Sequence, residues 1–104
     1  MRYAETHAIR GSVLVGPCSS DLGDELERQS GYFDKPWDWR SIMANQRRIA
    51  FVHSDNDPYI PQHEFKKIKD ELQPDVIAIP GARHFIEWDT FPQILEYILK
   101  TYSV

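Results

Sequence analysis

The sequence predicts an α/β fold in which about three parallel strands are covered by helices. The first observation behind this expectation is an alternation of short apolar runs with longer segments whose apolar residues recur at helical spacing. The second is that the short runs are apolar throughout, which is typical of strands buried on both faces of a parallel sheet. Strands and helices in alternation favour a parallel sheet with covering helices.

Three runs are the expected strands. They are SVLVG at residues 12–16, RIAFVHS at residues 48–54 and DVIAIPG at residues 75–81. Each is short, and the second and third end in turn residues. Because a strand of this composition needs cover on both faces, we expect the helices to form a layer on either side of the sheet.

Two segments are the expected helices. In residues 61–73, Phe65, Ile68 and Leu72 follow the i, i+3, i+7 spacing, so one helical face is apolar and the rest is charged. After the third strand, Thr90 and Gln93 have the spacing of a capping box, which predicts the start of a second helix. Its apolar stripe consists of Phe91, Ile94, Leu95, Ile98 and Tyr102.

The stretch at residues 18–46 differs from the rest of the chain. It is polar, it is interrupted by two glycines and a proline, and no strand pattern or long helix pattern continues through it. We interpret it as an excursion of short helices that forms a lid over one end of the sheet. Trp37 and Trp39 in this stretch, and Trp88 further along, are expected to be packing residues, with pocket lining as the alternative.

Length, charge and cysteine content exclude several classes of function. The 104 residues, 41% of them apolar and 27% charged, predict one soluble domain spanning residues 1–104. A net charge of −4 without a basic stripe argues against a nucleic-acid partner. No run approaches the roughly 18 apolar residues of a membrane span, and the N-terminus lacks the apolar centre of a signal peptide. We therefore expect a cytoplasmic protein, and the single Cys18 excludes an internal disulfide.

Three loops are expected to meet at one edge of the sheet, because the carboxyl ends of parallel strands lie together. They are GPCSSD at 16–21, HSDNDPYIP at 53–61 and GARHF at 81–85, and they bring together Asp55, Asp57 and His84. A carboxylate that orients an imidazole is half of a nucleophilic triad. Taken alone, His84 could instead cap a helix or lie at the surface, and Asp57 could start a turn.

A metal site is a further hypothesis for the same edge. His53, Asp55, Asp57 and His84 supply the imidazole and carboxylate groups that suit zinc or manganese. Nothing in their spacing is diagnostic, however, and triad chemistry requires no cofactor. We therefore expect neither a metal ion nor another cofactor.

Three segments resemble a known family. SDLGDELERQSGYFDKPWDW, DNDPYIP and RHFIEWDTF are similar to the C-terminal half of small serine hydrolases related to retinoblastoma-binding protein nine and its bacterial YdeN-type relatives. This resemblance implies a partial α/β-hydrolase fold, a three-layer αβα sandwich. It also implies that the acid of the Asp-Pro-aromatic-aliphatic-Pro turn is Asp57 rather than Asp55, and that the catalytic histidine is His84. The family usually has glycine before that histidine, where this chain has Arg83.

The nucleophile that the family would use is missing. No serine of the chain lies in a G-x-S-x-G elbow, and MRYAETH resembles the end of the helix that follows the elbow. We therefore expect the chain to start after its own nucleophile and to be inactive alone. Cys18, Ser19 and Ser20 lie in the loop after the first strand and are the alternative nucleophiles, although Pro17 does not fit an elbow.

Two classes of function follow from the sequence. The first is a serine hydrolase of small ester, amide or peptide-like acyl substrates, with the serine supplied from outside these residues. The second is a non-catalytic truncated isoform or pseudoenzyme that binds protein, with self-association through an exposed sheet edge. Pocket-protein binding is not expected, because the chain contains no L-x-C-x-E motif.

Overall fold

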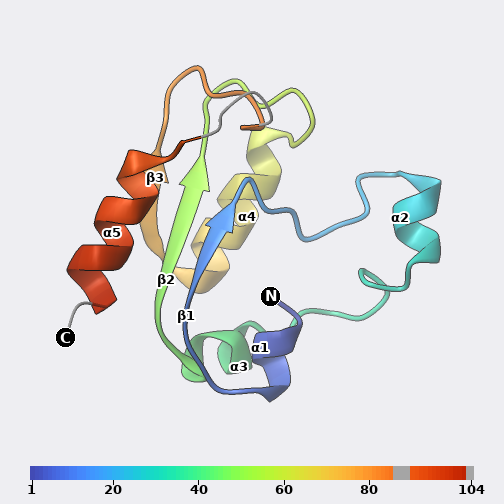
Figure 1. The fold of residues 1–104 in the computed structure, drawn as a ribbon. Coiled ribbons are helices and arrows are strands. Elements are labelled where there is room, and N and C mark those ends of the chain that lie inside the picture. The colour runs from blue at the N-terminus through green and yellow to red at the C-terminus, as the bar shows by residue number, and fades with distance from the viewer. Residues whose placement is uncertain (86–89, 103–104) are drawn as a thin grey trace.

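The computed structural model describes residues 1–85 and 90–102 (Figure 1). A parallel sheet has the strand order β1-β2-β3. The strands are β1 (Ile9–Val15), β2 (Gln46–His53) and β3 (Asp75–Ala78). The helices of the described residues are α1 (Tyr3–Thr6), α2 (Glu25–Gln29), α3 (Trp39–Ala44), α4 (Gln62–Leu72) and α5 (Pro92–Tyr102). The expected parallel sheet with covering helices is confirmed.

The central strand β2 is the most deeply buried part of the sheet. Ala50, Phe51 and Val52 have no exposed surface, because strands pair with β2 on both sides and helices cover both of its faces. β1 pairs with β2 in parallel from Ile9 onward, and β3 pairs with the second half of β2. All three strands therefore end at the same edge of the sheet.

Helices cover both faces of the sheet, as Figure 1 shows for α4 and α5. Side chains alternate between the two faces along β2. Phe51 faces α4 and packs in one core cluster with Phe65 and Ile68 of that helix. Val52 belongs to a second cluster, against which the α5 residue Ile94 packs. The structure thus has the three layers that the sequence predicted.

Several element boundaries differ from the sequence expectation. Strand β1 begins at Ile9 rather than at residue 12, and β2 begins at Gln46 rather than at residue 48. Helix α5 begins at Pro92, so the residue before the helix is Phe91 and not the predicted capping residue Thr90. Proline suits the first position of a helix, because its φ angle is already helical and its missing N–H would have no partner there. Strand β3 ends at Ala78, ahead of Pro80, which cannot donate to a sheet ladder.

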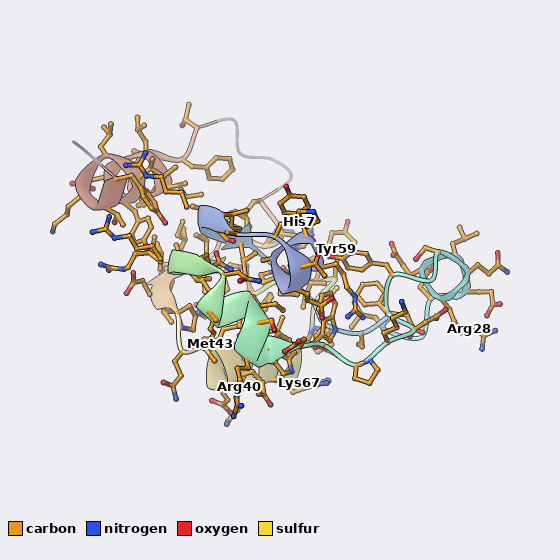
Figure 2. All side chains as sticks on the ribbon, turned by 90° about the horizontal axis from the view of Figure 1, so that it is seen from below. His7, Arg28, Arg40, Met43, Tyr59 and Lys67 are labelled. Carbon is orange, nitrogen blue, oxygen red and sulfur yellow. The ribbon has the colours of Figure 1, made fainter. Side chains whose placement is uncertain are left out.

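The 18–46 excursion contains two short helices, as expected, but they lie apart (Figure 1). Helix α3 lies beside α1 near the amino ends of the strands, and α2 stands away from the sheet. In Figure 2, which views the molecule from below, Arg28 of α2 lies on the opposite side from α5. Only the first half of the excursion can therefore form a lid near the carboxyl edge.

The excursion is anchored to the first helix by Arg2. The guanidinium of Arg2 lies over the ring of Trp37, 3.8 Å from its centroid. It also donates to the carbonyl oxygens of Tyr32, Lys35 and Pro36. An arginine head that stacks on an aromatic ring and satisfies several carbonyls holds a loop firmly, because its planar group loses little freedom for each bond formed.

Within the described residues, no helix has both the length and the apolar character needed to cross a membrane.

The core of the sheet sets the stability of the chain. We expect Phe51→Ala to lower the free energy of unfolding by about 3–5 kcal/mol, because it opens a cavity at a fully buried position. Leu26→Ala in α2 is the control, since Leu26 is 78% exposed and its truncation is expected to cost less than about 0.5 kcal/mol. Urea unfolding followed by circular dichroism measures both values, and equal costs would contradict the described core.

Candidate functional site

The site lies where β1 and β2 end and where the loop after β3 returns to them. Asp57 is fixed by the turn that follows β2. Asp57 Oδ1 accepts hydrogen bonds from the backbone N–H groups of Tyr59 and Ile60, with N···O distances of 2.8 and 2.9 Å. Pro58, which directly follows Asp57, favours this tight turn through its restricted φ angle. The side chain of Asp57 has no exposed surface.

His84 binds the other oxygen of this carboxylate. His84 Nδ1 and Asp57 Oδ2 are 2.6 Å apart, and the His84 side chain is 30% exposed. Because a carboxylate only accepts hydrogen bonds, Nδ1 is assigned as the donor, which leaves Nε2 as the acceptor of the neutral ring. The edge of the Tyr59 ring packs against the imidazole, with 5.5 Å between the ring centroids. The bond to Asp57 and the contact with Tyr59 therefore fix the orientation of the imidazole.

Gly16 makes room for this imidazole. It directly follows β1, and its φ is +53°, in the left-handed region. A Cβ atom at Gly16 would lie 3.0 Å from both Cε1 and Nδ1 of His84. Sequence analysis did not identify this glycine as a site residue, although a glycine between a buried strand and Pro17 is a signal that could have found it.

Asp55, the alternative acid, has a different partner. Its carboxylate accepts the backbone N–H of Gly81 at 2.9 Å. The structure thus brings Asp57 and His84 together and uses Asp55 to hold the start of the histidine-bearing loop.

The hypothetical metal ligands do not form a cluster. Among the described residues, no three histidine, cysteine, aspartate or glutamate side chains lie close enough together to hold a metal ion. The His53 ring packs against Phe51 and Phe65, with 5.5 Å between its centroid and each of theirs. Burial, and secondarily the charge of Lys69, lowers the pKa of His53. Both effects disfavour the charged form of the half-buried His53 ring.

The hydroxyl groups of Ser19 and Ser20 are directed to Glu64. Ser20 Oγ donates to Glu64 Oε1 at 2.6 Å, and Ser19 Oγ donates to Glu64 Oε2 at 3.3 Å. Glu64 lies in the first turn of α4 and is buried, so the two hydroxyls provide hydrogen bonds that it needs. Sequence analysis did not identify Glu64, which fixes the loop after β1 onto α4.

Cys18 is poorly suited to act as a nucleophile. Burial raises the pKa of its thiol, and the nearby carboxylates Glu64 and Glu27 raise it further. A thiolate is the attacking species, and a raised pKa reduces its population at neutral pH. Cys18 therefore has the opposite environment to that of a catalytic cysteine.

A pocket of about 630 Å³ opens beside His84. Its apolar and aromatic walls come from Leu22, Tyr32, Phe33, Tyr59 and Ile60. The first half of the 18–46 excursion thus contributes to the pocket, as a lid would. Trp37 and Trp39 do not line it and pack against the core on the α4 side, while Trp88 lies outside the described residues. Trp37 Nε1 donates to the carbonyl oxygen of Ser19 at 2.8 Å, which joins the start of the excursion to the segment before α3.

Comparisons with known proteins agree with this fold. No protein-family model matches the chain. The chain is 44% identical to serine hydrolase RBBP9 of Rattus norvegicus over 85 residues, which are 82% of this chain and 46% of the relative. It therefore spans about half the length of that curated relative. The crystal structure of the ydeN gene product from B. subtilis covers 99% of this chain with a TM-score of 0.84, at 18% identity and over 59% of its own length. That likeness concerns the fold, and it confirms the expected fold class.

Gly16 provides a test of the site's packing. We expect Gly16→Ala to lower the free energy of unfolding by about 1 kcal/mol more than Gly23→Ala, because its methyl group also displaces the His84 ring. Gly23 is the matched control, since its φ is +78° and a Cβ there meets nothing within 4 Å. Urea unfolding gives the two costs, and the NMR shifts of the His84 ring report its displacement. Equal costs with an unmoved ring would contradict the described contact.

Proposed function

We propose, from the premise that this chain is homologous to serine hydrolase RBBP9, that it carries the acid–base half of a serine hydrolase site. In this proposal His84 is the general base and Asp57 orients it. The observation that carries the proposal is the 2.6 Å hydrogen bond between a buried carboxylate and a partly exposed imidazole at the mouth of a pocket.

The chemistry assigned to the pair follows from this arrangement. Nε2 of His84 would take the proton of an attacking serine hydroxyl as the hydroxyl oxygen bonds to the acyl carbon. Asp57 would hold the ring in the required tautomer and stabilise the imidazolium that forms. His84 would then return the proton to the leaving group. The two hydrogen bonds from the Tyr59 and Ile60 amides keep the Asp57 carboxylate in place throughout.

The serine itself would be supplied from outside these residues. The chain contains no G-x-S-x-G sequence, and the hydroxyls of Ser19 and Ser20 are directed to Glu64 rather than to His84. Cys18 has a raised pKa. We therefore expect the isolated chain not to hydrolyse acyl substrates.

The pocket walls favour small acyl substrates that are neutral or positively charged. Asp21, Asp24 and Glu27 line the pocket together with the aromatic rings, and its described lining includes no lysine or arginine. Carboxylates at a pocket mouth repel an anionic substrate and attract a cationic one. The aromatic walls would hold the apolar part of an ester, amide or peptide-like substrate.

The proposal is tested by restoring the nucleophile. The part of rat RBBP9 that the 85 aligned residues leave out would be fused to this chain, and the fusion treated with a fluorophosphonate probe. We expect one labelled serine in the fused part. His84→Ala is expected to reduce the labelling rate about 10³-fold or more, and Asp57→Asn to reduce it strongly as well. Mass mapping identifies the labelled residue.

Matched controls separate the possible outcomes. His7→Ala, at a histidine that stacks on Tyr3 in the first helix, is expected to leave the labelling unchanged. A folded fusion that is not labelled, or labelling that survives His84→Ala, would contradict the proposed role. Labelling of the isolated chain at Cys18, Ser19 or Ser20 would show that the loop after β1 supplies the nucleophile.

A second candidate is protein binding, in the form of association between two copies of this chain through β1. Within the described part of the chain, β1 pairs with a strand on one side only, and Val15 at its end is 41% exposed. The free N–H and C=O groups of an edge strand can pair with another strand.

Sedimentation velocity tests this association. We expect the weight-average mass of the isolated chain to rise from monomer toward dimer over a concentration series from about 1 to 300 μM, the range that a weak strand pairing would span. Because Gly16 donates its N–H to Val52 in β2 and alternate residues point the same way, the N–H of Val15 faces the free edge. A proline in place of Val15 removes that N–H and should reduce the association. A single monomeric species at every concentration would contradict this candidate.

A further inference from the structure

The loop that carries His84 is bound by the turn after β2 at three of its residues, Gly81, Arg83 and His84. Its other two residues, Ala82 and Phe85, are buried in the second core cluster. We call residues 81–85 the histidine loop and residues 54–57 the supporting turn. At one end of the contact, Asp55 accepts the N–H of Gly81 at 2.9 Å. At the other end, Asp57 accepts from the His84 ring at 2.6 Å. The two remaining residues of the supporting turn bind the loop between these points.

Both peptide groups next to the Arg83 Cα are fixed. Asn56 Oδ1 accepts the Arg83 N–H at 2.8 Å. The Ser54 hydroxyl, which is fully buried, donates to the Arg83 carbonyl oxygen. Because these two bonds hold the peptide planes before and after Arg83, they set its φ and ψ angles. The direction in which the chain enters His84 follows from those angles.

The backbone on either side of His84 is strained. Arg83 has a φ of +53° and Phe85 a φ of +65°, both in the left-handed region that disfavours residues with a Cβ atom. Without outside support this backbone would relax to ordinary angles, and His84 would turn away from Asp57. A strained conformation persists where surrounding contacts determine it. For Arg83, the bonds from Asn56 and Ser54 are those contacts.

We propose that Asn56 is a positioning residue for His84, which acts by holding Arg83 in the left-handed conformation that aims the imidazole at Asp57. That Asn56 matters for catalysis rests on the function proposed above. That Asn56 positions the His84 ring does not depend on that function. Asn56 is exposed, belongs to neither core cluster, and accepts the loop N–H through its carboxamide oxygen, so its substitution removes no buried apolar group. Ser54 is fully buried and is therefore a less suitable position for a test.

The test measures the Nδ1 proton of His84 by NMR in the 104-residue chain, with selectively ¹⁵N-labelled histidine. A proton held between Nδ1 and a carboxylate resonates far downfield and exchanges slowly with water. We expect Asn56→Ala to speed this exchange about fivefold to tenfold, as the loss of one supporting hydrogen bond predicts. Asn56→Asp keeps an acceptor oxygen at the same position and should restore most of the protection.

Asn45→Ala is the matched control. The Asn45 side chain likewise makes one hydrogen bond to the backbone, but as a donor to the carbonyl oxygen of Ala4 and at the amino end of the sheet. It should leave the His84 signal unchanged. An unaltered Nδ1 proton in folded Asn56→Ala, or equal effects of Asn56→Ala and Asn45→Ala, would overturn the proposal. Failure of Asn56→Asp to restore the signal would overturn it as well.

A second measurement needs no substitution. In the unaltered chain, the Arg83 amide proton and the His84 Nδ1 proton should lose protection together as temperature rises, because one opening of the loop exposes both. Loss of the His84 signal while the Arg83 amide stays protected would overturn the proposal even if Asn56→Ala did not fold. Neither measurement depends on hydrolysis, so its outcome is separate from that of the fusion experiment.

Discussion

The parallel pairing of β2 with both of its neighbours is the constraint on which the rest of this structure depends. It places the carboxyl ends of β1, β2 and β3 at one edge, so that loops distant in sequence meet there. Burial of Phe51 and Val52 on opposite faces of β2 requires a helix layer on each side, which α4 and α5 provide. The apolar core thus fixes where polar side chains can converge without itself taking part in their chemistry.

At that edge, hydrogen bonds between side chains and loop backbone groups fix the conformation of the loops, which the apolar core alone does not. The supporting turn binds the histidine loop through four consecutive residues, and Glu64 binds the loop after β1 through two hydroxyls. Such bonds specify angles as well as distances, whereas apolar packing is nearly indifferent to direction. This division explains how Arg83 keeps backbone angles that a glycine would adopt without strain.

Sequence reasoning found the features that have a local pattern. Strand positions, the apolar face of α4 and the pairing of Asp57 with His84 at one edge followed from periodicity and topology, and the family resemblance chose Asp57 over Asp55. It missed Gly16, Asn56 and Glu64, because each acts through a contact with a residue distant in the sequence. A glycine, an asparagine in a turn and a glutamate in a helix are common in those settings, so their roles are visible only when the partners are placed. The start of α5 differs from the prediction for a simpler reason. A capping box at Thr90 would make Phe91 the first helical residue, whereas the helix begins at Pro92, and proline suits the first helical position.

Residues 19 and 37 of the 18–46 excursion meet, because the Trp37 indole donates to the carbonyl oxygen of Ser19, and Arg2 donates to the carbonyl oxygens of Lys35 and Pro36 just before Trp37. The segment between them forms a closed loop. Within it, the rings of Tyr32 and Phe33 pack on Trp37 and Arg2 donates to the carbonyl oxygen of Tyr32, so that residues 21–31 lie outside these anchoring contacts. The entropy of closing such a loop grows only with the logarithm of its length, by about 0.6 kcal/mol for each doubling. Insertions, deletions and exchanges within residues 21–31 would therefore leave the sheet and the Asp57–His84 pair almost undisturbed. An evolving lineage could in this way replace one wall of its pocket while keeping the chemistry beneath it.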